Sequence, residues 1–167
     1  LVVWSYYQSI KKADPGNEKM REIHHAIRTG AFAFIRREYT SVAWILLIAA
    51  PILWFTLGVA AMITFLIGAL LSLLAGLIGM NAATLANVRT AHASEKGAAE
   101  ALQIAFPAGA IMGLTVVGLN LIGITLLYSI FPDPQLLTGY GLGSSLVALF
   151  ARFGGGIFTK AADVGAD

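Results

Sequence analysis

The C-terminal stretch of the chain, residues 152–167, gathers charged residues of types that could do chemistry. It reads Arg-Phe-Gly-Gly-Gly-Ile-Phe-Thr-Lys-Ala-Ala-Asp-Val-Gly-Ala-Asp and so contains Arg152, Lys160, Asp163 and Asp167. On a helix that turns about 100° per residue, Asp163, Asp167 and Lys160 lie about 20°, 60° and 80° from Arg152. The four charged side chains would therefore share one narrow face.

Such a face suits a hydrated divalent metal and a phosphate-like anion, because Asp163 and Asp167 stand one helical turn apart with Lys160 beside them. The simpler interpretation is a helix end whose charges pair with one another or with water. Three successive glycines, residues 154–156, favour a functional site instead. Each costs a helix about 1 kcal/mol relative to Ala unless a neighbour or a ligand approaches closely.

The remaining composition is that of a membrane protein. Hydrophobic residues make up 57% of the 167 residues and charged residues 12%, with a mean hydropathy of +0.77, whereas a soluble domain carries about 25% charged residues. The net charge of +2 comes from basic residues that are clustered beside apolar runs, which indicates that they set the membrane topology. We therefore expect no nucleic-acid partner. The absence of Cys excludes disulfides and thiolate metal sites.

We predict an all-α polytopic membrane protein, a bundle of transmembrane helices joined by charged links. The predicted segments are the end of a first transmembrane helix (1–10), a cytoplasmic amphipathic segment lying at the membrane surface (11–40), two spans around Gly58 (41–57 and 59–90), a cytoplasmic link (91–99), a further span (100–130), an external turn (131–141) and a final span that ends in the charged motif (142–167). The uncharged runs 41–57 and about 59–80 are each close to the roughly 20 residues that cross a bilayer, whereas the uncharged run 101–130 is longer than one span needs.

Small and polar residues within the spans predict how the helices pack. Gly68, Ser72 and Gly76 stand four residues apart, which is typical of a ridge for close helix contact. Asn120 is a lone amide in an apolar run, and we interpret it as one partner of an interhelical hydrogen bond rather than as a transport site.

Basic residues orient the chain, because cytoplasmic loops are enriched in Lys and Arg. Seven basic residues lie between Lys11 and Arg37, before the first complete span, and Arg89 and Lys96 follow the second span. The turns at Gly58 and at residues 132–141 contain no Lys or Arg. The final helix is therefore predicted to run from outside to inside, with Lys160, Asp163 and Asp167 at its cytoplasmic end. Arg152 lies about 16 Å deeper than Asp163 along the axis. An arginine at membrane depth is costly unless it faces a polar interior or a carboxylate, so Arg152 is a functional candidate.

The stretch Arg152–Asp167 resembles the signature of the ion-pumping membrane-bound inorganic pyrophosphatases over its whole length. Weaker similarity extends the resemblance over nearly the entire chain, through Gly30–Tyr39, Gly76–Met80, Ala86–Ala91 and Ala101–Gly113. It implies a homodimer with about sixteen membrane helices in each subunit, of which this chain would hold the end of the first to the fifth. The missing initiator Met and the end of the chain inside the motif also predict an N-terminal fragment.

The resemblance implies a multi-pass enzyme of a prokaryotic plasma membrane that hydrolyses pyrophosphate on the cytoplasmic side and drives H⁺ or Na⁺ outward. It implies Mg²⁺ as cofactor, and K⁺ as an additional ion in part of the family. By motif position, Lys160 would bind pyrophosphate, Asp163 and Asp167 would bind Mg²⁺, and Arg152 would belong to the ion gate. The family motif continues beyond Asp167 with further carboxylates, so the catalytic set is incomplete here. We expect the fragment to need the remainder of the subunit for activity.

The alternative is a secondary transporter or channel. In that case Arg152 and Asp163 would line a permeation pathway without hydrolysis, and flux would not depend on pyrophosphate. Further Asp-rich helix ends beyond Asp167 would favour the pump, whereas a plain apolar hairpin would favour the transporter.

Overall fold

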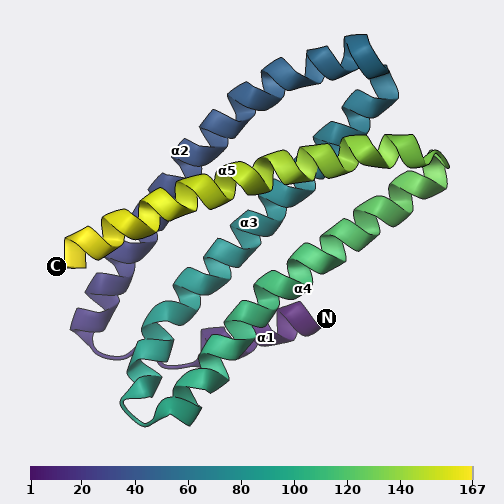
Figure 1. Ribbon diagram of the computed structural model, residues 1–167. Coiled ribbons are helices and arrows are strands. Elements are labelled where there is room, and N and C mark those ends of the chain that lie inside the picture. The colour runs from purple at the N-terminus through teal and green to yellow at the C-terminus, as the bar shows by residue number, and fades with distance from the viewer. Residues whose placement is uncertain (167) are drawn as a thin grey trace. The chain divides into compact units, whose positions relative to one another are not determined.

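The chain folds into α-helices joined by short links, as a computed structural model that describes residues 1–166 shows (Figure 1). The helices are α1 (Val2–Lys12), α2 (Glu18–Leu57), α3 (Val59–Ser94), α4 (Ala98–Ile130) and α5 (Pro134–Ala166), and the described residues contain no strand. Helices α2 to α5 are long and apolar enough to cross a membrane, by length and composition. The predicted all-α architecture is therefore confirmed. Asp167 lies outside the described residues.

The helices build two compact units. The first contains Leu1–Ala33 and Ala75–Gly118, and the second contains Phe34–Leu74 and Leu119–Asp167. Helices α2, α3 and α4 each contribute residues to both units, whereas α1 belongs to the first and α5 to the second.

In the first unit, α1 packs against the C-terminal part of α3. Ile10 is 1% exposed and belongs to an apolar core with Ala82, Leu85, Ala86 and Ile111. Arg89 closes this contact, since its Nε donates to the carbonyl oxygen of Ala13 at 3.0 Å and its Nη1 to that of Leu85 at 2.8 Å. The end of α1 is thus held to α3 by apolar packing and by one guanidinium.

In the second unit, α5 crosses α3 with its first half and α2 with its second half (Figure 1). Gly68 on α3 lies against the backbone of Tyr140, and Gly143 on α5 lies against the carbonyl group of Phe65. An added Cβ at either glycine would overlap backbone atoms of the facing helix. Close backbone approach of this kind is what small residues permit in membrane helices.

Side-chain hydrogen bonds join α5 to α3 and to α4. The hydroxyl of Ser72 donates to the carbonyl oxygen of Ser144 at 3.3 Å, and the hydroxyl of Tyr140 donates to Oδ1 of Asn120 at 3.0 Å. Gly68 and Ser72 of the predicted ridge therefore contact α5. The prediction that Asn120 makes an interhelical hydrogen bond is confirmed.

The segment predicted as an external turn, residues 131–141, is mostly helical. Helix α5 begins at Pro134, and Tyr140 is already buried within it. Asp133 caps this helix, because its Oδ1 accepts the backbone N–H of Gln135 at 2.9 Å. Pro134 occupies the first helical position, where its missing amide hydrogen is not needed. Asp133 and Pro134, which the predicted turn included, therefore start a helix, and the turn shortens to residues 131–133.

The predicted boundary at residue 40 is also absent. Helix α2 continues from its charged half into its apolar half over 40 residues, about 60 Å at 1.5 Å per residue. Around the expected break, the hydroxyls of Thr40 and Ser41 bond back to the carbonyl oxygens of Arg36 and Arg37, so these polar residues are accommodated within the helix. The expected separate surface helix is the first half of a longer one. Likewise, the predicted link 91–99 shortens to residues 95–97.

Candidate functional site

Residues 152–166 form the last turns of α5, without interruption. Because this stretch is helical, the angular spacing predicted for its charged side chains applies to Arg152, Lys160 and Asp163. The Nζ of Lys160 lies 3.9 Å from Oδ2 of Asp163, and the two side chains are 77% and 70% exposed. An ion pair so exposed contributes little to stability. The structure therefore brings a cation and a carboxylate together where both remain accessible.

Arg152 stands apart from this pair. Eleven residues separate it from Asp163 along α5, which corresponds to about 16 Å along the axis. Its side chain is exposed and has no hydrogen bond or ion pair within residues 1–166. The prediction that Asp167 lies beside Asp163 concerns a residue outside the described part of the chain.

The opposite side of the motif packs on α2. The ring of Phe158 stacks on that of Phe34, with 5.0 Å between centroids. An added Cβ at Gly154 would lie 3.2 Å from the Phe34 ring and 3.3 Å from Oε1 of Glu38, whereas Cβ atoms at Gly155 and Gly156 would meet nothing within 4 Å. Close approach within the described residues therefore explains one glycine of the three. Helix α5 turns Gly154 and Phe158 toward α2 and leaves Lys160 and Asp163 exposed.

A cavity of about 550 Å³ lies along this α2–α5 contact. Its lining is mostly apolar and comprises Phe34, Arg37, Glu38, Ser41, Phe150, Phe153, Gly154, Ile157, Phe158 and Ala161. Oε1 of Glu38 is buried and has no hydrogen-bond partner in the described part of the chain. Glu38 is not among the residues that the sequence predicts for the site, because it stands in a charged stretch that predicts a solvated face. Its spacing of four residues from Phe34 is the signal that places it on the packed face.

No group of three or more His, Asp or Glu side chains within residues 1–166 is close enough to hold a metal. Asp163 is the predicted Mg²⁺ ligand that the described residues include. Magnesium is usually held by one or two protein carboxylates together with water and phosphate oxygens. An accessible carboxylate beside an ammonium group would fit one part of such a site.

Comparison with known proteins gives a consistent picture. The profile of the family described as "Inorganic H+ pyrophosphatase" matches residues 1–167. The chain is 49% identical to a K(+)-insensitive pyrophosphate-energized proton pump of Methanosarcina mazei over 97% of its own length and 24% of the relative's. It is 50% identical to a putative K(+)-stimulated pyrophosphate-energized sodium pump of Clostridium tetani, over 95% and 24% respectively.

A third relative, a K(+)-insensitive pyrophosphate-energized proton pump of Caldanaerobacter subterraneus, is 40% identical over 100% of this chain and 27% of its own length. The chain thus spans about a quarter of the length of these curated relatives. The profile match over all residues, together with the helices and the C-terminal motif, shows that the chain belongs to the inorganic H⁺ pyrophosphatase family.

Proposed function

We propose that the protein to which this chain belongs hydrolyses inorganic pyrophosphate and couples that reaction to the movement of H⁺ or Na⁺ across a membrane. The observation that carries this proposal is the accessible pair of Lys160 and Asp163, 3.9 Å apart at the end of α5. This pair lies in a chain whose relatives are named pyrophosphate-energized pumps. One is a proton pump and the other a sodium pump at nearly equal identity, so the similarity leaves both ions in the proposal.

The roles of the motif residues follow from their chemistry. The Lys160 ammonium group donates charge-assisted hydrogen bonds to a phosphate oxygen of pyrophosphate. Asp163, joined by Asp167, contributes carboxylate oxygens to the magnesium that accompanies the substrate. When bound, Mg²⁺ offsets the negative charge that develops on the departing phosphate. Activation of the attacking water falls to carboxylates of the remaining subunit, on the cytoplasmic side of a prokaryotic plasma membrane.

Arg152 has a different role in this proposal. Its distance of about 16 Å along α5 from Asp163 is too large for both side chains to contact one pyrophosphate group. We assign Arg152 to the ion pathway, where a carboxylate from another part of the subunit pairs with it. The functional unit is a homodimer of complete subunits, and K⁺ dependence differs among the named relatives.

The test uses the full-length protein in inverted membrane vesicles, with pyrophosphate hydrolysis and ion uptake measured together. We expect both activities to require Mg²⁺ and to fall at least tenfold in Asp163→Asn and Lys160→Gln, since each substitution removes a charged contact worth about 1.5–3 kcal/mol. Glu22→Gln and Lys19→Gln are matched controls, because these residues form an exposed ion pair 3.1 Å apart on α2. Hydrolysis without Mg²⁺, or full activity after Asp163→Asn, would overturn the site assignment.

The same vesicles separate the pump from the secondary transporter. Uptake that depends on pyrophosphate supports the pump. Ion flux that proceeds equally without pyrophosphate, with no hydrolysis, would support a transporter in which Arg152 and Asp163 line the pathway.

A further inference from the structure

Glu38 is an acidic side chain that α2 turns toward the motif on α5, within the second unit. A Cβ added at Gly154 would lie 3.3 Å from Oε1 of Glu38 and 3.4 Å from its Cδ. One helical turn away, the ring of Phe34 stacks on that of Phe158. The two α2 residues stand four positions apart, and so do the two α5 residues, so successive turns of the two helices meet. The carboxyl group of Glu38 therefore belongs to the α2–α5 contact.

The surroundings of this carboxyl group are apolar. The α5 residues that line the cavity of about 550 Å³ beside it all lack polar side chains: Phe150, Phe153, Gly154, Ile157, Phe158 and Ala161. On α2, the hydroxyl of Ser41 lines the same cavity but donates to the carbonyl oxygen of Arg37 at 3.1 Å. Helix α5 therefore offers Glu38 neither a side-chain hydrogen-bond donor nor a cation along this cavity.

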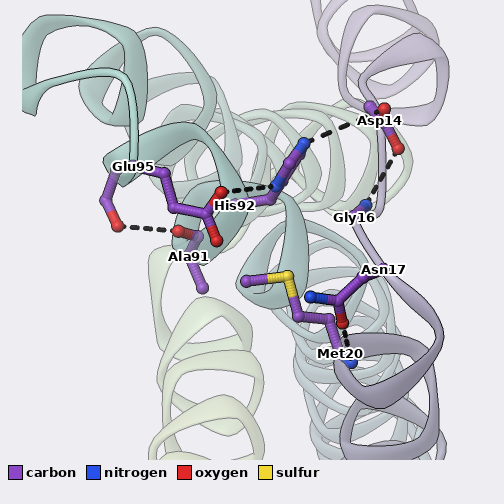
Figure 2. A network of polar contacts seen from close by, with 8 residues as sticks. Asp14, Gly16, Asn17, Met20, Ala91, His92 and Glu95 are labelled. Carbon is purple, nitrogen blue, oxygen red and sulfur yellow. Dashed lines mark hydrogen bonds and ion pairs between the residues drawn. The ribbon is translucent and has the colours of Figure 1, made fainter.

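Glu38 has no counter-charge within residues 1–166. Its Oε1 is buried and accepts no hydrogen bond there, and Arg37 lines the same cavity without forming an ion pair. The acids of the helix links differ. Figure 2 shows the His92 ring between Asp14, whose Oδ2 lies 3.8 Å from Nε2, and Glu95, whose Oε2 lies 3.4 Å from Nδ1. Withdrawing an unpaired carboxylate from water is costly, and such a group normally binds a proton instead.

The contact also lies at the edge of the apolar part of both helices. Glu38 precedes the uncharged run 41–57 of α2 by three residues, about 4.5 Å along the axis. Counted from Pro134 at the start of α5, the roughly 20 residues that cross a bilayer end near Gly154. Both helices thus place this contact at one boundary of a bilayer, where the membrane limits the access of water to the carboxyl group.

We propose that Glu38 is a proton-binding site, whose carboxyl group is protonated at neutral pH while α2 and α5 are packed together. The neutral group avoids the cost of burying a charge. Loss of the proton places an unpaired negative charge against Gly154, and so weakens the packing of α2 on the part of α5 that carries Lys160 and Asp163. This site adds a residue of α2 to the surroundings of the motif, and it does not depend on pyrophosphate hydrolysis.

The first test is infrared spectroscopy of the full-length protein in lipid at neutral pH, because the C=O stretch of a protonated carboxyl group is separate from the bands of a carboxylate. We expect the wild-type protein to show such a band, and Glu38→Gln to remove it. Glu22→Gln is the matched control, since Glu22 is 71% exposed and paired with Lys19, and it should leave the band in place. A spectrum that Glu38→Gln leaves unchanged would overturn the proposal.

The second test compares the thermal unfolding of the same three proteins between about pH 5 and about pH 9, above the ordinary pKa of glutamate. A carboxyl group that binds its proton more tightly in the folded than in the unfolded protein makes the folded state less stable as pH rises. Glu38→Gln has nearly the same shape and cannot ionise. We therefore expect its Tm to exceed that of wild type by a difference that grows to about 1–3 °C over this range.

The difference in Tm between wild type and Glu22→Gln should stay constant over the same range, because an exposed carboxyl group is ionised throughout it. The opposite result for Glu38 is equally clear. If Glu38→Gln is less stable than wild type at every pH, Glu38 is ionised and pairs with a cation of the remaining subunit, and the proposal is wrong.

Discussion

The hydroxyl of Tyr140 on α5 donates a hydrogen bond to Oδ1 of Asn120 on α4 across 3.0 Å. Tyr140 is 2% exposed, and a Cβ added at Gly123 would lie 2.7 Å from this hydroxyl. The hydrogen bond therefore lies in a closely packed contact between consecutive helices of the second unit.

This contact predicts a measurable coupling. Tyr140→Phe keeps the ring and removes the hydroxyl, so we expect it to lower the free energy of unfolding by about 0.5–1.5 kcal/mol. Asn120→Ala should cost a similar amount, and the double variant should cost less than the sum. The measurement is a double-mutant cycle on the full-length protein in detergent. Strictly additive losses would show that the two side chains do not stabilise each other.

The α3–α5 contact predicts opposite effects at two neighbouring glycines. A Cβ at Gly143 would overlap the carbonyl group of Phe65, whereas a Cβ at Gly141 would meet no atom within 4 Å. We expect Gly143→Ala to destabilise the protein by about 1–3 kcal/mol through overpacking. Gly141→Ala should be neutral or stabilising by up to about 1 kcal/mol, because Ala favours the helix. Thermal unfolding of both variants checks this, and equal shifts in Tm would contradict the packing.

Composition and the length of the apolar runs were sufficient to predict the helical membrane fold. The ends of the elements were harder to predict, as residues 131–141 show. Asp133-Pro134 can break a helix or begin one, and the outcome depends on whether the Asp133 carboxylate caps the first turn. The sequence pattern also changes at residue 40 from charged to apolar, but the backbone has no reason to break there. The change from charged to apolar residues marks where the helix passes from one surrounding to another, and the helix itself continues through it.

The glycine triplet predicts a difference between Gly154 and Gly155. A Cβ at Gly154 would lie 3.2–3.4 Å from Phe34 and Glu38, whereas Gly155 has open space around its Cα. Both substitutions to Ala gain helix propensity of about 1 kcal/mol, but Gly154→Ala also requires the side chains of Phe34 and Glu38 to move by a few tenths of an ångström. We therefore expect Gly154→Ala to be the less stable variant by about 1 kcal/mol, as measured by thermal unfolding. Greater loss of stability in Gly155→Ala would contradict the α2–α5 contact.

The link between α1 and α2 predicts a pH effect. The backbone N–H of Gly16 is the chief cause that lowers the pKa of Asp14 below its ordinary value of 3.8. A carboxyl whose pKa is lowered on folding stabilises the folded state above its unfolded pKa. That contribution is lost as pH falls through the lowered value.

Asp14→Asn keeps an oxygen that can accept the hydrogen bond from Gly16 but cannot ionise. The variant therefore separates the contribution of the Asp14 charge from that of the hydrogen bond. We expect the variant to be less stable than wild type at pH 6 and the difference to shrink as pH falls below about 3.8. Thermal unfolding of both proteins across this range is the measurement. A difference that stays constant with pH would show that the charge of Asp14 does not contribute.

Of the candidate site, the sequence predicts the helix and the charged face but not what the opposite face touches. Lys160 and Asp163 stand three residues apart, so a helix brings them together without help from other segments. Glu38 lies more than a hundred residues earlier in the chain and meets Gly154 only through the packing of α2 on α5. Contacts between two helices depend on how each helix is rotated about its axis and how far it is shifted along the other, and the periodicity of the sequence does not determine either.

Arg152 and Lys160 are predicted to affect different steps, because eight residues of helix, about 12 Å, separate them along α5. Lys160→Ala should raise the KM for pyrophosphate about tenfold to a hundredfold, since it removes a charged contact to phosphate. Arg152→Ala should leave KM within about threefold of wild type and should lower the number of ions transported per pyrophosphate hydrolysed. Arg152→Lys should retain part of that coupling, because it keeps the charge. Equal increases in KM in Arg152→Ala and Lys160→Ala, at unchanged coupling, would assign Arg152 to substrate binding instead of the ion pathway.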